Sequence, residues 1–428
     1  MKKQRYRIRL ASLLLIALFV VLGIYAVRSF LLYGSRWFSY SANPRLNAQK
    51  QHVTEGDILD RNGVMLAYTE NGERIFHTDP KVRSALVHLL GDRHGMIANT
   101  VETLHAGYLY GYQSSLADAI RHLTSPESEK KGNTITLTVD SALCAAIPGF
   151  YENHPLSRGK SGAAAVINYK TGEILALVSL PCFDPDNASD AVIALLDQPY
   201  WNRATQWAYA PGSTFKIVTS AAALTKIPDA ASRLFTCTGA LQVAPDFTVK
   251  DFNQASHGSL TLREAFLHSC NCVYASLALE MGDSSLRAAA EEFGFNQDFL
   301  FRDLVVEKSV YPSDPQSGAA LAASGYGQSG ISVTPLHLCL ISAAVANDGV
   351  MQEPRLLKTV KTFSGVPVLS YSSARVRTVC SPETARLLQS MMRDVVQNGS
   401  GTKAAVSTLD VRGKTGTSEV YVENKKKN

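Results

Sequence analysis

The chain has 428 residues, of which 46% are hydrophobic and 18% are charged. This length suffices for two domains, and the composition is that of a folded protein, which excludes an intrinsically disordered chain. The formal net charge is +5, but five basic residues before position 10 account for all of it. The net charge of the rest of the chain is therefore balanced, which implies no nucleic-acid-binding face, and we expect no nucleic-acid partner.

The N-terminal end predicts a membrane anchor. Residues 1–9 hold the five basic side chains, and the eighteen residues 10–27 that follow contain no charge. Such a run is long enough for a spanning helix, and the basic flank is expected to stay cytoplasmic. A cleaved signal peptide is the alternative, but the run exceeds a usual signal core and lacks a small-x-small cleavage site. We predict a cytoplasmic tail (1–9), a transmembrane signal-anchor helix (10–32), and an extracytoplasmic remainder.

A small membrane-proximal module is predicted after the anchor, over residues 35–132. Asn62-Gly63 lies between apolar flanks, which is a strong signal for a β-hairpin. We interpret the neighbouring Asp60 and Arg61 as no more than a surface salt bridge.

A second domain is expected over residues 133–428. It opens with an alternating strand, 133–140, which precedes a helical segment. Residues 162–179 then predict a hairpin with a Lys-Thr-Gly sequence, 170–172, at its turn. A turn tip between two strands is not where an active site would place this sequence, so we interpret it as turn chemistry.

The stretch around Ser213 predicts a nucleophile. Pro211 and Gly212 indicate a turn, and the helix expected after it is apolar on nearly every face over 217–224, so it should be buried. Lys216 lies one helical turn beyond Ser213 on the same face, where its amine can reach the serine oxygen. A desolvated lysine can take the serine proton. Because Ser-x-x-Lys alone is a weak pattern, the prediction needs further motifs.

Two further motifs supply that support. Ser269-Cys270-Asn271 interrupts a helix that a capping box opens at Thr261, and Lys414-Thr415-Gly416-Thr417 follows in a strand-like run. The loop at 269–271 alone has an ordinary explanation as a helix–helix turn with capping side chains. The ordered trio, however, is typical of penicillin-binding proteins and serine β-lactamases. We therefore predict one active site that all three motifs share.

The cysteines predict no metal site. They are an odd number without metal-site grouping, and Cys270 and Cys272 are too close in sequence for a usual zinc pair. We expect buried small apolar side chains and leave one disulfide open. The seven positions are Cys144, Cys182, Cys237, Cys270, Cys272, Cys339 and Cys380.

With these residues in hand, the chain resembles the class B penicillin-binding proteins, the monofunctional peptidoglycan D,D-transpeptidases of bacteria. The likeness covers most of the chain and is most specific in its later stretches. The resemblance implies an α/β (α+β) fold, in which helices flank the central antiparallel sheet of the transpeptidase domain. It also implies that the module at 35–132 is β-containing and dimerisation-like. The stretches that carry it include Asp60–Gly63, Leu137–Asp140, Lys170–Ala176, Asn202–Ala204, Pro211–Lys216, Ser269–Asn271, Gly327-Gln328, Thr334–Leu336 and Lys414–Thr417.

The resemblance implies an acyl-enzyme mechanism. Ser213 would attack the penultimate D-Ala carbonyl of a stem peptide, and Lys216 would take its proton. Ser269 would relay protons to the leaving amine, and Asn271 would bind the donor backbone.

The third motif would bind the terminal carboxylate of the substrate. Lys414 and the hydroxyls of Thr415 and Thr417, on either side of Gly416, would hold this group. Backbone N–H groups of Ser213 and Thr417 would form the oxyanion hole. β-Lactams would acylate Ser213 by mimicking D-Ala-D-Ala.

The resemblance also implies a place in cell-wall synthesis. The expected partners are stem peptides ending in D-Ala-D-Ala, β-lactams, the membrane, a polytopic SEDS-type glycan polymerase and other cell-wall synthesis proteins. The expected location is the bacterial cell membrane, with a single membrane pass and an extracytoplasmic catalytic domain. No cofactor is expected.

One departure from the family pattern is that only twelve residues follow Gly416. The family sheet continues through two further strands and a last helix, and without them the strand at Lys414 has no hydrogen-bonded route to the central sheet. We expect the chain to be a fragment of a longer reading frame and to be weakly active or inactive as given.

Other functions remain open from the sequence. A serine β-lactamase shares the trio, but no Glu-x-x-Leu-Asn stretch follows Asn271 to activate water. A D,D-carboxypeptidase differs only in using water as the acceptor. A non-enzyme alternative is a membrane-tethered cell-wall scaffold that truncation has inactivated.

Overall fold

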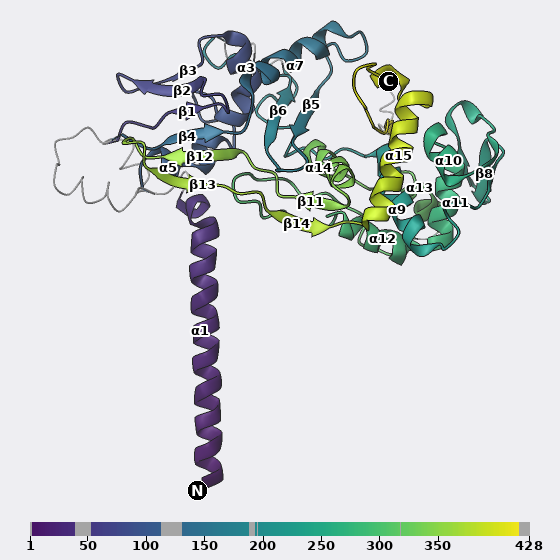
Figure 1. Cartoon of the computed structure of the whole chain (residues 1–428), viewed down its shortest axis with the longest axis horizontal. Coiled ribbons are helices and arrows are strands. Elements are labelled where there is room, and N and C mark those ends of the chain that lie inside the picture. The colour runs from purple at the N-terminus through teal and green to yellow at the C-terminus, as the bar shows by residue number, and fades with distance from the viewer. Residues whose placement is uncertain are drawn as a thin grey trace, which may run out of the picture.

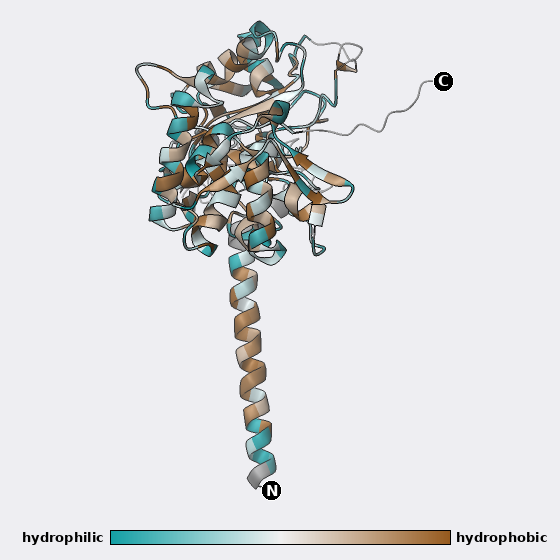
Figure 2. Cartoon of the chain, turned by 90° about the vertical axis from the view of Figure 1, so that its right-hand side faces the viewer, coloured by the Kyte–Doolittle hydropathy of each residue, from teal (hydrophilic) through white to brown (hydrophobic). Residues whose placement is uncertain are grey.

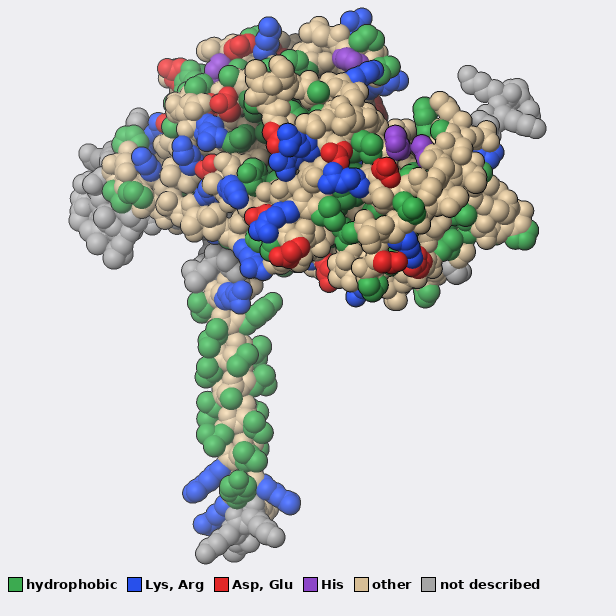
Figure 3. Space-filling model, turned by 45° about the vertical axis from the view of Figure 1, so that its right-hand side comes forward, with side chains coloured by type: hydrophobic (Ala, Val, Ile, Leu, Met, Phe, Trp, Pro, Cys, Tyr) green, Lys and Arg blue, Asp and Glu red, His purple; other side chains and the backbone are tan. Residues whose placement is uncertain are grey.

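The computed structural model describes residues 2–38, 53–112, 131–187, 193–194, 196–316 and 318–418. A long helix, α1 (Lys2–Phe38), projects as a rod from the folded body (Figure 1). Its stretch Gln4–Ser29 is apolar and lies outside the body, long enough to cross a membrane. Hydrophobic residues line this rod and hydrophilic ones gather at its amino end (Figure 2), where basic side chains project (Figure 3). The predicted anchor is confirmed as a helix of suitable length and composition.

The largest sheet has six strands in the order β13-β12-β4-β1-β2-β3. Only β1 and β4 pair in parallel, and the other neighbours are antiparallel. Because β4 lies between β1 and β12, this sheet combines strands from both sides of position 133. The strands are β1 (Ile58–Leu59), β2 (Met65–Glu70), β3 (Glu73–Phe76), β4 (Thr134–Leu137), β12 (Leu357–Lys361) and β13 (Pro367–Ser370).

The predicted hairpin at Asn62-Gly63 is confirmed between β1 and β2, with Gly63 at a φ of 85°. The interpretation of Asp60 as a surface charge is wrong. Asp60 is fully buried, and its carboxylate accepts hydrogen bonds from the backbone N–H of Val64 (2.9 Å) and the hydroxyl of Ser141 (2.7 Å). A buried carboxylate requires such donors, so Asp60 fastens the hairpin to the helix that Ser141 opens.

The second hairpin is also confirmed. β5 (Gly162–Ile167) and β6 (Ile174–Leu180) pair antiparallel, with the Lys-Thr-Gly sequence at the turn between them. Helix α14 (Pro335–Ala346) packs on β5, whereas α7 (Ser141–Asn153) and α3 (Pro80–Leu90) pack on β6. The apolar strand β6 is therefore buried beneath helices from distant parts of the chain.

A helical region follows and holds α9 (Lys216–Lys226) at its centre, in contact with α11 (Asn271–Met281), α12 (Asp283–Glu292) and α15 (Pro382–Asn398). Lys216 to Ala223 are all buried, as the apolar sequence predicts. Further elements are α4 (Val101–Leu104), α5 (Ala106–Leu109), η1 (Gly212–Phe215), β7 (Phe235–Cys237), β8 (Ala240–Ala244), β9 (Phe247–Lys250), η2 (Phe252–Gln254), β10 (Gly258–Leu260), α10 (Leu262–His268), α13 (Gly318–Ser324), β11 (Val350–Gln352), β14 (Arg375–Thr378) and η3 (Thr402–Ala404).

The predicted strand around Lys414 does not form: residues 410–418 are not paired with any strand. A strand requires a neighbour for its N–H and C=O groups, and in the described chain β5 and β6 pair only with each other. The seven cysteines all lie in described regions and are free, so none forms a disulfide. Four of them are buried and three are half-buried.

Candidate active site

Ser213 lies on a tight turn that two other segments of the chain contact closely. Gly212 has a φ of 51° and donates its N–H to the Gly327 carbonyl oxygen at 3.0 Å. A Cβ on Gly212 would collide with the Thr417 carbonyl oxygen, and one on Gly327 would collide with the Gly212 carbonyl oxygen. These close approaches explain why glycine occupies both positions. They also place the segment that carries Thr417 directly against the turn that carries Ser213.

Lys216 begins α9 directly after this turn, and its side chain is fully buried. Its amine donates to the Ser269 carbonyl oxygen (2.5 Å), the Ser269 hydroxyl (3.2 Å) and the Asn271 side-chain oxygen (2.8 Å). Burial, together with the nearby positive charge of Lys414, lowers the pKa of Lys216 well below its usual 10.5. Burial therefore disfavours the charged form of this amine relative to a lysine in water.

The loop that carries Ser269 and Asn271 is set by its local sequence. The predicted capping box is confirmed, since Thr261 and Glu264 each accept the other's backbone N–H at the start of α10. Ser269 ends that helix in the left-handed conformation, with a φ of 58°, and Cys270 caps α11. The Asn271 side-chain NH2 donates to the Lys250 carbonyl oxygen at 3.0 Å. Both polar side chains therefore face Lys216.

Lys414 reaches the same group of side chains although its segment is not a strand. Its amine donates to the Ser269 hydroxyl at 2.9 Å and lies 5.7 Å from the centroid of the Phe266 ring. Gly413 ties the segment to α15 by donating its N–H to the Met392 carbonyl oxygen at 3.1 Å. Burial lowers the pKa of Lys414 to about 8.

The neighbours of Lys414 line the turn of Ser213. A Cβ on Gly416 would lie 3.1 Å from the Pro211 carbonyl oxygen. The Thr415 hydroxyl is 2.7 Å from the Ser400 hydroxyl, and Thr417 is exposed. The structure thus joins the side chains of Lys216, Ser269, Asn271 and Lys414 and places the backbone at 416–417 against the turn of Ser213, whereas the Thr415 hydroxyl faces Ser400.

The Ser213 hydroxyl itself makes no hydrogen bond within the described residues. The Lys216 amine contacts Ser269 and Asn271, and its predicted contact with the Ser213 oxygen stays a prediction. Catalytic hydrogen bonds are often long without substrate and tighten only in the complex.

Two residues of this site were missed by the sequence analysis. The buried carboxylate of Asp251 accepts the backbone N–H of Asn271 and that of Cys272 (3.2 Å), so it positions the loop. The ring of Tyr274 is buried, and its centroid lies 5.2 Å from the Lys216 amine nitrogen. Asp251 follows β9 and has no local pattern that marks it, whereas Tyr274 lies one helical turn beyond Asn271.

Comparison with known proteins identifies the family of the chain. Residues 162–428 match the transpeptidase domain of penicillin-binding proteins. A peptidoglycan D,D-transpeptidase PbpA of Mycolicibacterium smegmatis is 31% identical over 272 residues, which cover 60% of this chain and 55% of that protein. The chain spans about half the length of the curated relatives it matches.

Two solved structures share the fold over most of the chain. The D,D-transpeptidase domain of a peptidoglycan glycosyltransferase from Eggerthella lenta is 32% identical with a TM-score of 0.72, covering 86% of this chain and 88% of that one. The imipenem acyl-enzyme complex of penicillin-binding protein A from M. tuberculosis is 25% identical with a TM-score of 0.77 and the same coverage. The chain belongs to the penicillin-binding protein transpeptidase family, as a class B member.

Proposed function

We propose that the protein is a membrane-anchored peptidoglycan D,D-transpeptidase that forms an acyl-enzyme on Ser213. This proposal is carried by the buried amine of Lys216, whose hydrogen-bond acceptors in the described part of the chain are uncharged oxygens of Ser269 and Asn271. A buried lysine with a lowered pKa beside a serine turn is suited to remove the serine proton. The named activity of the PbpA relative supports the same reaction.

In the proposed acylation, the Ser213 oxygen bonds to the penultimate D-Ala carbonyl carbon while its proton passes to the Lys216 amine. The peptide C–N bond then breaks, and the terminal D-Ala leaves with a proton relayed through the Ser269 hydroxyl. That hydroxyl lies within hydrogen-bonding distance of both lysine amines, at 3.2 and 2.9 Å, which supports its role as a relay. An acceptor amine from a second stem peptide then bonds to the ester carbon, the C–O bond to Ser213 breaks, and a proton of that amine passes through Lys216 to the Ser213 oxygen.

Substrate binding is proposed for the segment 414–417. The charge of Lys414, with the hydroxyls of Thr415 and Thr417, would hold the terminal carboxylate, while the side chain of Asn271 binds the donor backbone. Gly416 lets the segment approach the turn closely. The N–H groups of Ser213 and Thr417 would stabilise the oxyanion, and the loss of one such donor typically costs about 3 kcal/mol of barrier.

The location and partners are part of the proposal. We infer a cytoplasmic tail (1–9), a transmembrane helix (10–32), a membrane-proximal module (35–132) and an extracytoplasmic transpeptidase domain (133–428). The apolar helix and its basic end support this orientation. Stem peptides and β-lactams would be the ligands, and a SEDS-type glycan polymerase would be the membrane partner.

Covalent labelling with a fluorescent penicillin tests the proposal. We expect a single adduct, localised to Ser213 by mass spectrometry, that decays slowly. Fast decay would instead indicate a β-lactamase, and the absence of any adduct on folded protein would favour the scaffold function. Release of free D-Ala without cross-linked product from a stem peptide would indicate a carboxypeptidase. The extent of labelling also tests the expected weak activity: labelling of a small fraction of folded protein would agree with it, and labelling of nearly all of the protein would overturn it.

A further inference from the structure

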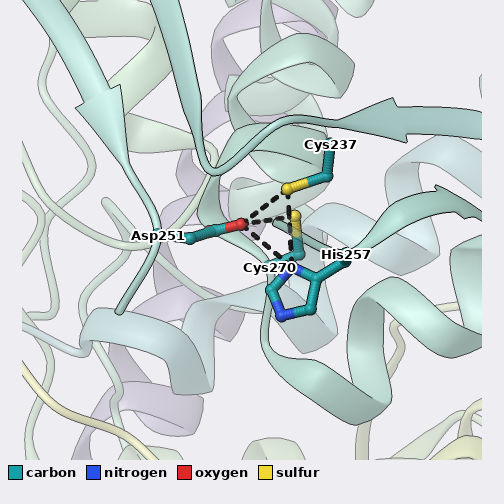
Figure 4. Close-up of side chains that lie close together, drawn as sticks. All are labelled: Cys237, Asp251, His257 and Cys270. Carbon is teal, nitrogen blue, oxygen red and sulfur yellow. Dashed lines mark hydrogen bonds and ion pairs between the residues drawn. The ribbon is translucent and has the colours of Figure 1, made fainter. Parts of the chain in front are cut away.

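Four side chains that could bind a metal converge directly behind the loop of Ser269. They are Cys237 at the end of β7, Asp251 after β9, His257 before β10, and Cys270 at the cap of α11 (Figure 4). One ligand atom from each lies within 4.8 Å of every other. The sequence analysis missed this group because it considered Cys270 with its neighbour Cys272, whereas the fold pairs Cys270 with the distant Cys237.

The contacts within the group are centred on one carboxylate oxygen. Oδ2 of Asp251 lies 2.9 Å from the Cys237 sulfur, 3.0 Å from the Cys270 sulfur and 3.2 Å from Nδ1 of His257. The Cys237 sulfur is in turn 3.4 Å from Nδ1 of His257. The four side chains therefore turn their ligand atoms toward one another (Figure 4).

The separations fit a tetrahedral ion. Zinc bonds of about 2.0 to 2.3 Å hold their ligand atoms roughly 3.3 to 3.8 Å apart. Four of the six separations are 2.9 to 3.4 Å and need to open by only a few tenths of an ångström, and the other two lie within 4.8 Å. Two thiolates with an imidazole and a carboxylate form a ligand set that suits zinc, whereas magnesium and calcium prefer oxygen ligands.

Each of the two sulfurs also accepts a hydrogen bond from the backbone. The Gly239 N–H donates to the Cys237 sulfur and the Val273 N–H donates to the Cys270 sulfur, each at 3.4 Å. Gly239 has a φ of 90°, and a Cβ there would collide with the Gln254 carbonyl oxygen, so its backbone can adopt this position only as glycine. Backbone donors of this kind stabilise metal-bound ligands from the outer shell.

We propose that Cys237, Asp251, His257 and Cys270 bind one structural zinc ion. The four protein ligands would complete a tetrahedral shell, so the ion would have no open position for substrate. Binding would release the two thiol protons to solvent. The two cysteines and Asp251 are buried, and the His257 side chain is 18% exposed, which gives the ion an entry path.

The consequence for the active site is positional. Cys270 lies between Ser269 and Asn271, and the second oxygen of Asp251 accepts the Asn271 and Cys272 N–H groups. A zinc ion on these residues would therefore fix the loop that holds the Lys216 amine. This consequence rests on the proposed function, but metal binding itself does not.

Metal content tests the proposal without reference to catalysis. We expect the protein, purified without chelator, to hold about one zinc per chain by elemental analysis, and Cys237→Ser and His257→Gln to hold fewer than about 0.2. Cys380→Ser is the control, because Cys380 lies outside the group, and it should retain the metal. Circular dichroism would verify that each variant is folded.

A second measurement uses the unmodified protein. Removal of zinc by a chelator should expose two further thiols to a thiol reagent and lower the melting temperature by at least about 5 °C, and added zinc should restore both. Equal zinc content in wild type and both ligand variants would overturn the proposal. So would zinc-free protein that cannot be loaded, or isolated protein with a Cys237–Cys270 disulfide. Normal penicillin labelling of the zinc-free protein would refute only the positional role.

Discussion

Lys216 and Arg83 are both buried cations, yet their surroundings differ in one respect. Arg83 is paired with carboxylates. Its Nε donates to Oδ1 of Asp184 at 2.5 Å and its Nη2 donates to Oδ2 of Asp184 at 2.7 Å, while Nε also lies 3.5 Å from Oδ2 of Asp186. Hydrogen bonding to Asp184 raises the pKa of Arg83, and Arg83 lowers the pKa of Asp184 to about 2. Lys216 has no carboxylate within ion-pairing distance in the described chain, and its pKa is lowered.

This difference separates a structural charge from a reactive one. A paired cation stays charged, whereas a buried amine that meets only neutral oxygens and a second cation gains by losing its proton. Side chains whose pKa is strongly shifted by their surroundings are typical of catalytic sites. The predictions below test whether Lys216 and Arg83 behave as this comparison requires, beginning with the nucleophile that Lys216 is proposed to serve.

Replacing the nucleophile should have the largest effect. Ser213→Ala removes the oxygen that bonds to the carbonyl, so the rate of penicillin acylation should fall by at least about 10⁴-fold. The rate is measured by labelling at several penicillin concentrations. Ser276→Ala is the control, because the Ser276 hydroxyl only bonds the Cys272 carbonyl oxygen within α11. Covalent labelling of the Ser213 variant at another residue would contradict the assignment.

Replacing the base should have the next largest effect. Lys216→Met removes the proton acceptor but keeps a buried side chain of similar length, so acylation should slow by about 10³-fold. Stopped-flow labelling would measure the rate. An unchanged rate in folded Lys216→Met protein would mean that another group activates Ser213.

The paired cation should show the opposite behaviour. Arg83→Met leaves Asp184 without its main partner, so the free energy of unfolding should fall by about 3 kcal/mol while the acylation rate of the folded protein stays unchanged. Denaturant unfolding checks the first result and labelling the second. Arg93→Met is the matched control: Arg93 is 46% exposed in its pair with Asp186, and its loss should cost less than about 1 kcal/mol.

The stability of the protein should also depend on the proton of Lys216. The pKa of Lys216 in the folded state lies well below its usual 10.5, which applies to the unfolded chain. Between these two pKa values the unfolded chain carries the proton and the folded protein does not, so folding releases it. As the pH falls through that window, wild type should lose stability relative to Lys216→Met by up to about 1.4 kcal/mol per pH unit. Unfolding curves at several pH values measure this slope. A constant difference between the two proteins would mean that Lys216 remains charged when buried.

Lys414 should give the smallest effect, a shift in the pH profile. Burial lowers its pKa to about 8, so wild type should lose the carboxylate-binding charge, and with it acylation, above that pH. Arginine keeps its charge, so Lys414→Arg should retain its own maximal rate to higher pH. The second-order acylation rate is measured from pH 6 to pH 10. Identical alkaline limbs in both proteins would assign that limb to another group.

Much of the site could be predicted because its pieces are marked locally. The hairpin at Asn62-Gly63, the capping box at Thr261 and the order of the three motifs each depend on neighbouring residues. Asp60 could not be interpreted in this way, because its burial depends on a helix that begins at Ser141. The position of β4 between β1 and β12 likewise depends on pairing between distant strands.

The surroundings of the loop at Ser269 likewise could not be predicted from neighbouring residues in the sequence. Asp251 and Cys237 meet Cys270 because β7 and β9 pack against α11, and no spacing along the chain indicates that meeting. The strand predicted at Lys414 failed for the converse reason. Its local sequence favours a strand, but strand formation also requires a neighbour.

The ionisation of Lys216 is the most direct test of the whole account. Nuclear magnetic resonance of protein labelled with ¹⁵N at its lysine side chains, with Lys216→Met used for assignment, would follow the amine as the pH is raised. The account predicts that Lys216 titrates well below 10.5 and is neutral where the enzyme acylates fastest. A Lys216 amine that stays protonated up to its usual pKa would contradict the central claim.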